Sequence, residues 1–206
     1  MDSLWFLVPL ILVSALLFFV GYNFAGWFTV GLIIFVAYFF RDPVRTPPEG
    51  EDLLVAPADG KIVKVDTAYA SPDHDEGSVC ISTFLSVFNV HIQRAPIAGT
   101  VARKFYNKGK FMAAWDHKAS LDNEQALTVF KTGIGPVGVK QIAGFVARRI
   151  ITWANVGSSL ERSQRLGLIR FGSRVDLILP PEVTVIVKVG DHVKGGETVM
   201  ARAKRG

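Results

Sequence analysis

Gly172 and Ser173 interrupt two stretches of strand-like sequence near the end of the chain. An apolar run leads into the pair, and apolar residues alternate with polar ones from Arg174 to Pro180. This pattern predicts a strand, a tight break and a second strand. A plain β-turn or bulge explains the pair by itself, because glycine has a permissive backbone and serine hydrogen-bonds its own main chain. The same two residues also allow a chemical reaction, because an unhindered serine hydroxyl can attack the carbonyl before it and turn the peptide bond into an ester.

The longer string around the pair favours this reaction. Residues 167–180 read GLIRFGSRVDLILP, and the pattern GxxxFGSxVxxxLP resembles the processing site of phosphatidylserine decarboxylases, where a Gly-Ser bond cleaves itself. The resemblance implies that the bond between Gly172 and Ser173 is cut. The precursor would then divide into a large chain, 1–172, and a small chain, 173–206, which remain partners.

The resemblance also implies that Ser173 becomes a covalent pyruvoyl cofactor. After the shift to an ester, β-elimination frees the glycine carboxylate, and the dehydroalanine that remains hydrolyses to pyruvoyl and ammonia. Decarboxylation of an amino acid leaves electrons on Cα, and a pyruvoyl carbonyl held as a Schiff base accepts them. The expected reaction converts phosphatidylserine, a phospholipid of the membrane, to phosphatidylethanolamine and carbon dioxide.

Two further residues take catalytic roles through the same resemblance. Residues 84–91, FLSVFNVH, resemble the family's Phe-Leu-Ser and Val-His phrases and place the catalytic histidine at His91. Residues 56–62, APADGKI, resemble its Pro-x-Asp-Gly motif, whose aspartate, here Asp59, orients that histidine. A neutral imidazole can take the proton of a serine hydroxyl, and a carboxylate can fix its tautomer. Taken alone, each residue is better explained by structure, His91 as a half-buried strand histidine and Asp59 as a turn aspartate before glycine. Some members carry a second histidine where this chain has Phe88, so that residue's role is not available here.

A second Gly-Ser step, Gly157-Ser158, stands shortly before the first and could be mistaken for the cleavage site. Ser158 and Glu161 have the spacing of a capping box. The sequence therefore predicts that Ser158 caps a short helix.

The first forty residues are almost uncharged. Leu4 to Val20 and Phe24 to Phe40 are two apolar runs, each close to the roughly 17-residue lower limit for crossing a bilayer. They predict a hydrophobic helical hairpin that anchors the chain to a membrane over residues 1–40. A cleaved signal peptide is disfavoured, because Asp2 is acidic and no Ala-x-Ala site follows the apolar run.

Arg41 and Arg45 directly follow the second run. Positive charge beside a membrane segment marks the cytoplasmic side, so we expect the protein at the cell membrane with residues 41–206 on its cytoplasmic face. Whether the hairpin spans the bilayer or lies in one face is left open, because proline and glycine interrupt both runs.

Charge and cysteine content bound the remaining functions. The net charge is +5, but the basic residues are scattered and form no nucleic-acid motif, so attraction to an anionic lipid surface explains them better. Cys80 is the only cysteine and lies in an apolar run, which predicts a buried, inert thiol and no disulfide. We find no sequence pattern of a metal site, a P-loop or a dinucleotide-binding fold.

The expected fold is mainly β (α+β), with a Pro-rich linker over 41–52 and a catalytic domain over 53–206. Residues 183–203 alternate between glycine turns and, like APADGKIVKV near the front, resemble the half-barrel of biotinyl and lipoyl carrier domains. This predicts hammerhead elements of a barrel-sandwich hybrid, and it supplies the alternative function of a carrier or binding module on a membrane anchor. The Met-Lys pair that carriers modify is missing from the chain, which argues for a shared fold only. A homo-oligomer is left open.

Overall fold

The structure is a computed structural model that describes residues 3–71, 74–109, 123–144, 149–170 and 173–204. The chain divides into two compact units, Met1–Pro43 and Val44–Gly206. Each unit is described by itself below.

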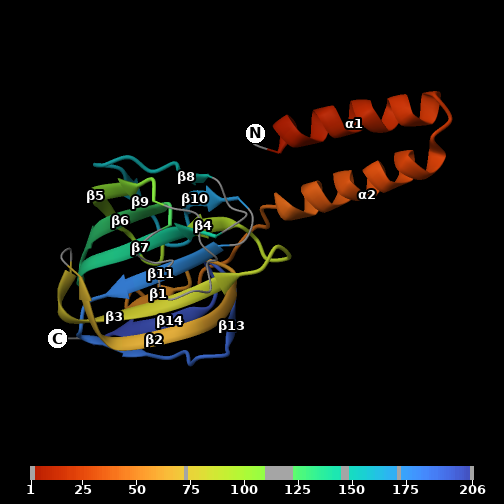
Figure 1. The fold of residues 1–206 in the computed structure, drawn as a ribbon. Coiled ribbons are helices and arrows are strands. Elements are labelled where there is room, and N and C mark those ends of the chain that lie inside the picture. Colours follow the sequence, from red (N-terminus) through yellow and green to blue (C-terminus); the bar gives the residue numbers. More distant parts are fainter. Residues whose placement is uncertain (1–2, 72–73, 110–122, 145–148, 171–172, 205–206) are drawn as a thin grey trace. The chain divides into compact units, whose positions relative to one another are not determined.

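The first unit is a hairpin of two helices, α1 (Leu4–Phe19) and α2 (Asn23–Phe39) (Figure 1). The helices contact each other through small groups and aromatic rings: the Ser14 hydroxyl donates to the carbonyl oxygen of Gly26 at 3.3 Å, and the rings of Phe18 and Trp27 meet edge to face. Large apolar side chains are exposed along both helices. The predicted helical hairpin is confirmed. In the described part of the chain, neither helix combines the length and the apolar character needed to cross a membrane.

The second unit is built from strands, which confirms the mainly β prediction. The strands are β1 (Leu53–Val55), β2 (Gly60–Ser71), β3 (His74–Leu85), β4 (Ile92–Arg94), β5 (Gly99–Asn107), β6 (Gln125–Thr132), β7 (Gly135–Ala143), β8 (Ile150–Thr152), β9 (Ser159–Leu160), β10 (Arg165–Ile169), β11 (Ser173–Leu179), β12 (Val183–Val185), β13 (His192–Val193) and β14 (Val199–Ala203).

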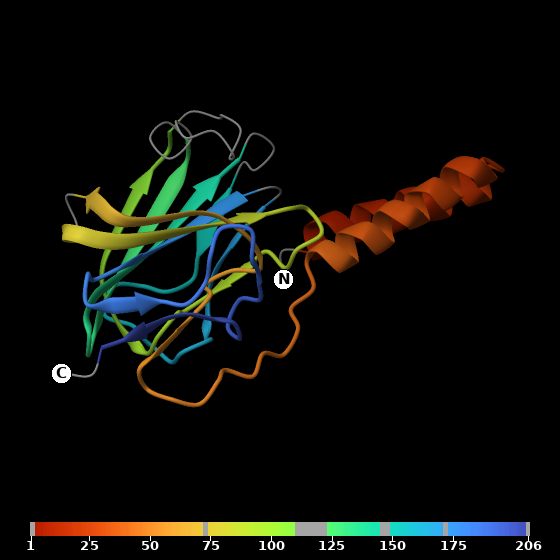
Figure 2. The ribbon, with the colours of Figure 1, turned by 90° about the horizontal axis from the view of Figure 1, so that it is seen from below.

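These strands form one large sheet and two small ones. The eight-stranded sheet has the order β13-β2-β3-β11-β7-β6-β5-β9 and curls around the unit, as Figures 1 and 2 show. The small sheets have the orders β1-β14-β12 and β4-β10-β8. The chain therefore leaves the small β4-β10-β8 sheet at the end of β10 and enters the centre of the large sheet at the start of β11.

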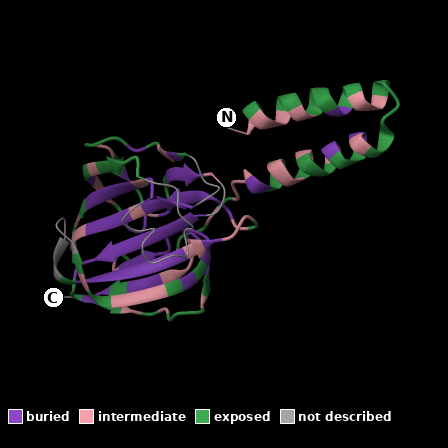
Figure 3. Cartoon of the chain, viewed as in Figure 1, coloured by how far each residue is buried: buried purple, intermediate pink, exposed green. Residues whose placement is uncertain are grey.

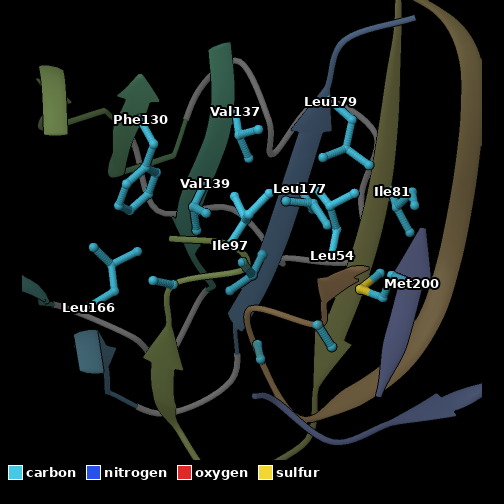
Figure 4. Close-up of a cluster of buried hydrophobic side chains, with 14 of the residues drawn as sticks. Leu54, Ile81, Ile97, Phe130, Val137, Val139, Leu166, Leu177, Leu179 and Met200 are labelled. Atoms are coloured by element: carbon cyan, nitrogen blue, oxygen red, sulfur yellow. The ribbon is translucent and has the colours of Figure 1, made fainter. Parts of the chain in front are cut away.

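Side chains of β11 alternate between two faces of the large sheet because a strand has a period of two. Val175, Leu177 and Leu179 point into the main core, where Figure 4 shows Leu177 and Leu179 among apolar side chains from the surrounding strands. Ile178 points the other way, into a smaller cluster with Cys80. Both faces of this strand are buried, and Figure 3 shows that burial extends to its neighbours.

The helix predicted after Ser158 is wrong. Ser159–Leu160 is the edge strand β9, which pairs with Gly99 and Thr100 of β5. The Ser158 hydroxyl instead accepts a hydrogen bond from the amide of Asn155 at 3.3 Å and so closes a turn. An edge strand with free backbone groups was available for pairing, and this tertiary contact outweighed the local capping signal.

Cys80 is buried with 2% of its surface exposed, as predicted. Burial, helped by the negative charge of Asp176, raises the pKa of its thiol from 9.0 to about 12. A raised folded pKa favours the protonated thiol, so the stabilising contribution is full below pH 9 and is lost as the pH rises towards 12.

We therefore expect Cys80 of the native protein to resist alkylation by iodoacetamide at pH 8. The folded chain holds about a thousandfold less thiolate than the unfolded chain at that pH, and burial also blocks access. Intact mass measured over time, with a urea-unfolded sample as the control, gives the two rates. Labelling of both samples at the same rate would contradict this account of the thiol.

Candidate active site

Ser173 is the first residue of β11 and lies between two neighbouring strands. It pairs with Leu85 at the end of β3 and with Ala143 at the end of β7. Its side chain is fully buried, and its hydroxyl has no hydrogen-bond partner within the part of the chain that the structure describes. A buried hydroxyl that nothing satisfies is costly, and such groups concentrate where a protein uses them. Gly172, the predicted partner in cleavage, lies outside the described residues.

His91 is fully buried and follows a tight turn that closes the end of β3. Both the amide and the hydroxyl of Ser86 donate to the side-chain oxygen of Asn89, at 2.9 and 2.8 Å, and this holds the turn. The carbonyl oxygen of Asn89 lies 2.9 Å from Nδ1 of His91. Because a carbonyl can only accept, Nδ1 carries the proton, and in the neutral form of the ring Nε2 is then the basic nitrogen. This is the tautomer that a general base needs.

The fold brings the segment of His91 to the segment that precedes Ser173. The amide of Ile169 donates to the carbonyl oxygen of His91 at 3.4 Å, and Leu168 pairs with Ile92. Three residues separate Ile169 from Ser173 along the chain. The structure thus places His91 and Ser173 at one end of the sheets. The transfer of a proton from Ser173 to His91 stays a prediction.

Asp59 stands directly before β2, at the same end of the large sheet. Gly60 follows it and lies so close to the carbonyl oxygen of Phe84 that a Cβ would collide with that oxygen, which explains the glycine. Phe84 of β3 pairs with Lys61 of β2 on one side and with Arg174 of β11 on the other. Asp59 is therefore two strands away from the start of β11, a distance of about 10 Å.

The contacts of Asp59 include two partners that sequence reasoning missed. Nη2 of Arg45 lies 2.9 Å from both carboxylate oxygens, and the amide of Gly195 donates to Oδ1 at 2.8 Å. The Arg45 side chain is itself buried and also lies 3.5 Å from Glu197. Arg45 belongs to the predicted linker, so this segment is fastened to the β unit. The orientation of His91 by Asp59 stays a prediction.

Two buried residues on the other side of Ser173 were given no chemistry by the sequence. The side-chain amide of Asn123 donates to the carbonyl oxygen of Ala143 at 2.7 Å, beside the pairing position of Ser173. Glu124 accepts hydrogen bonds at one carboxylate oxygen from the hydroxyl of Tyr106 and the amide of Ile150. The Glu124 hydrogen bond, followed by burial, raises the pKa of Tyr106. The only sign of these two residues in the sequence was that an Asn-Glu pair stands ahead of a predicted strand.

A buried ion pair adjoins Ser173 on the opposite face of β11. Arg174 donates from Nε and Nη2 to the two carboxylate oxygens of Asp176 at 2.7 and 2.8 Å. Burial alone would lower the pKa of Arg174, but the hydrogen bonds and charge of Asp176 outweigh burial and raise it. Within the described ranges, no group of histidine, cysteine and acidic side chains could hold a metal ion.

A buried serine whose hydroxyl has no partner among the described residues stands at the entry to a central strand, at the same end of the sheets as His91, and these are the groups that chemistry on the chain itself requires. A family model described as phosphatidylserine decarboxylase matches residues 32–201. The chain belongs to the phosphatidylserine decarboxylase family, as its motifs predicted. It is accordingly a decarboxylase, and its cofactor is a pyruvoyl group.

Several curated relatives are similar to this chain over most of their length. A phosphatidylserine decarboxylase proenzyme of Trichlorobacter lovleyi is 50% identical over 175 residues, 84% of this chain and 79% of that protein. One of Chlorobium limicola is 45% identical over 178 residues, 85% of this chain and 82% of that protein. A protein of Methanothermobacter thermautotrophicus, provisionally named an archaetidylserine decarboxylase proenzyme, is 45% identical over 198 residues, 90% of this chain and 88% of that protein. The alternative of a carrier domain finds no support in these relatives.

Proposed function

We propose that this chain is a proenzyme that cleaves itself between Gly172 and Ser173 and then removes carbon dioxide from the serine headgroup of phosphatidylserine, leaving phosphatidylethanolamine. The observation that carries this proposal is the buried Ser173 hydroxyl, which has no hydrogen-bond partner in the described part of the chain. The names of the relatives share a serine headgroup and differ in the lipid that bears it. The serine headgroup is therefore the part of the substrate that these names have in common.

Self-cleavage begins when the Ser173 hydroxyl attacks the carbonyl carbon of Gly172. The hydroxyl proton passes to Nε2 of His91, the C–N bond breaks, and the chain is joined through an ester to Oγ. A base then removes the Cα proton of residue 173, and the glycine carboxylate leaves from Cβ. Water converts the resulting dehydroalanine to a ketone and releases ammonia.

The residues present fit a cofactor made at this position. Residue 173 is fully buried between β3 and β7, so its side-chain position is shielded from bulk water. When formed, the pyruvoyl group supplies the electron sink that decarboxylation of an amino acid requires. His91, held by the Asn89 carbonyl, is the candidate to move the proton that replaces carbon dioxide, and Asp59 with Arg45 would hold a fixed charge pair at the same end of the sheet.

We expect the small chain of the active enzyme to begin with a ketone and not with an amine. It should resist Edman sequencing, and sodium cyanoborohydride added during turnover should attach lipid-derived mass to residue 173. Peptide mass mapping of both chains gives the site. Removal of pyridoxal phosphate or divalent metals with scavengers should leave activity unchanged and serves as the control. A readable Ser173 amino terminus in an active sample, or mass on a lysine of the large chain, would rule out this chemistry.

We also propose that the helical hairpin attaches the enzyme to the cytoplasmic face of the cell membrane. Its exposed side chains include Trp5 at 80%, Phe24 at 89% and Trp27 at 68% exposure, an apolar surface of the kind that membranes bind. Arg41 lies 3.7 Å from the ring centre of Tyr38 and donates to its carbonyl oxygen, which places a cation and an aromatic ring together at the end of α2. Such pairs are typical of the interface between lipid and water.

Deletion of residues 1–40 should release the protein from vesicles but spare self-cleavage. The expected effect on the vesicle-bound fraction is a loss of about tenfold or more, because the hairpin carries most of the exposed apolar surface. Sedimentation with vesicles containing anionic lipid, compared with neutral vesicles, separates apolar from electrostatic binding. Full retention of the shortened chain on both kinds of vesicle would show that the anchor lies in Val44–Gly206.

The resemblance of residues 183–203 to carrier half-barrels is proposed here as a shared fold without a shared function. The segment forms β12, β13 and β14, and β14 lies between β1 and β12. These strands are contributed by the small chain, so the half-barrel would be completed by both chains of the processed enzyme.

A further inference from the structure

Three polar side chains form a hydrogen-bonded chain that ends on the backbone of His91. The hydroxyl of Thr152 donates to Oε1 of Gln141 at 2.8 Å, and Nε2 of Gln141 donates to Oε1 of Gln93 at 2.9 Å. Nε2 of Gln93 then donates to the carbonyl oxygen of His91 at 2.8 Å. Both glutamine side chains are fully buried. We call Gln93, Gln141 and Thr152 the glutamine chain.

The His91 carbonyl sets the direction of every bond in the glutamine chain. A carbonyl oxygen only accepts, so Gln93 must present its NH₂ group to it and its own oxygen to Gln141. Gln141 must then donate to Gln93 and accept from Thr152, whose hydroxyl is able to donate. Each glutamine uses its oxygen and its nitrogen, and neither amide can flip without losing two hydrogen bonds. A buried polar network that is satisfied in this way is rigid.

The glutamine chain is built around Gly167 of β10. Gln93 of β4 and Thr152 of β8 pair with Gly167 from its two sides. Gln141 comes from β7 of the large sheet and lies over the same glycine, since a Cβ at Gly167 would approach Nε2 of Gln141 to 2.9 Å. A Cβ there would also collide with the backbone oxygen of Ile151, so the first glycine of the motif GxxxFGS leaves space for the neighbouring strand as well as for an amide from the other sheet.

The glutamine chain therefore links the small β4-β10-β8 sheet to the large sheet. The residues between β10 and β11, 170–172, contain the proposed cleavage site, and we call them the cleavage segment. β10 ends in the small sheet at Ile169, and β11 begins in the large sheet at Ser173. Gln141 lies on β7, where it pairs with Val175 of β11, while Gln93 and Thr152 flank β10. The glutamine chain thus joins β7 of the large sheet to β4 and β8 of the small sheet, beside β10 and β11.

We infer that Gln93, Gln141 and Thr152 are positioning residues for self-cleavage, which hold the His91 backbone and the two ends of the cleavage segment in one fixed arrangement. The inference rests on the proposed cleavage between Gly172 and Ser173. A misplacement of about 1 Å between reacting groups can cost on the order of a hundredfold in rate, so a rigid link at this point has a direct kinetic effect.

The test compares Thr152 of β8 with Thr132 of β6. Each hydroxyl donates a hydrogen bond to a residue of β7, Thr152 to Gln141 near the end of that strand and Thr132 to Gly135 at its start. Thr152→Val removes the donor to Gln141, whereas Thr132→Val removes a donor to the carbonyl oxygen of Gly135 at 2.6 Å, far from His91. In a time course of freshly synthesised precursor, Thr152→Val should slow cleavage about fivefold and Gln141→Leu about tenfold or more. Thr132→Val should cleave at the rate of the unsubstituted chain.

A second measurement separates positioning from a general loss of stability. In a His91→Ala background, Thr152→Val and Gln141→Leu should slow the residual rate by a clearly smaller factor than in the unsubstituted chain, because the imidazole that the glutamine chain helps to position is gone and only its hold on the backbone remains. Equal slowing in both backgrounds, or cleavage of folded Thr152→Val at the rate of Thr132→Val, would overturn the inference. Should Gln141→Leu not fold, Thr152→Val decides alone. An unsubstituted chain that stays whole would instead refute the proposed cleavage.

Discussion

Replacement of Ser173 by alanine is expected to leave one uncleaved and inactive chain. The alanine has no hydroxyl to attack the preceding carbonyl, so neither the ester nor the ketone can form. The change should cost little in stability, because the hydroxyl that it removes is buried without a hydrogen-bond partner in the described part of the chain. Denaturing intact-mass measurement should therefore show a single species of 206 residues.

Ser158→Ala is the matched control for this substitution. Ser158 also follows a glycine, but it lies in a turn and its hydroxyl accepts from the amide of Asn155. This variant should be processed into chains 1–172 and 173–206. Cleavage that persists in Ser173→Ala, or that is lost only in Ser158→Ala, would move the processing site.

Replacement of His91 by alanine is expected to slow self-cleavage by about a hundredfold or more, the usual effect of removing a general base. His192→Ala is the control, because His192 is an exposed histidine on β13, at the edge of the large sheet. A time course of precursor processing, with circular dichroism to show that the variant is folded, gives the rates. Normal processing in folded His91→Ala would return His91 to the role of a buried strand residue.

Asp59→Asn should also slow processing, and the structure adds a complication that the sequence did not show. The substitution leaves the buried Arg45 cation without one of its carboxylate partners, so part of any effect would come from stability. A double variant, Asp59→Asn with Arg45→Met, removes the cation as well. Processing that stays slow in the double variant, with thermal stability recovered, assigns the effect to the loss of the Asp59 carboxylate and not to the unpaired cation.

Local patterns predicted the elements of this fold well. The helical hairpin followed from two uncharged apolar runs, and the strands before and after Gly172 followed from alternation. The helix expected after Ser158 failed because the capping box is a local signal, and the edge of β5 provided a stronger partner for Ser159 and Leu160.

The contacts that complete the site could not be read from sequence because their residues are far apart in the chain. Gly195 donates to Asp59 across 136 positions, and Gln141 donates to Gln93 across 48. Arg45 stood in a stretch rich in proline and charge that indicated a linker. Gln141 and Arg45 are ordinary polar residues in their own segments, and Gly195 contributes only its backbone amide, so none of them signals its distant partner in the sequence.

The position of β11 in the large sheet has a consequence for the processed enzyme as a physical assembly. The proposed cleavage would make β11 to β14 a separate polypeptide, although β11 is hydrogen-bonded to β3 and β7, β13 to β2, and β14 to β1. Unfolding of the precursor is unimolecular, whereas recovery of the cleaved enzyme requires two chains to meet, so its apparent stability depends on protein concentration. A processed molecule that unfolds in dilute solution then separates into two polypeptides, and maturation is in this sense a one-way step.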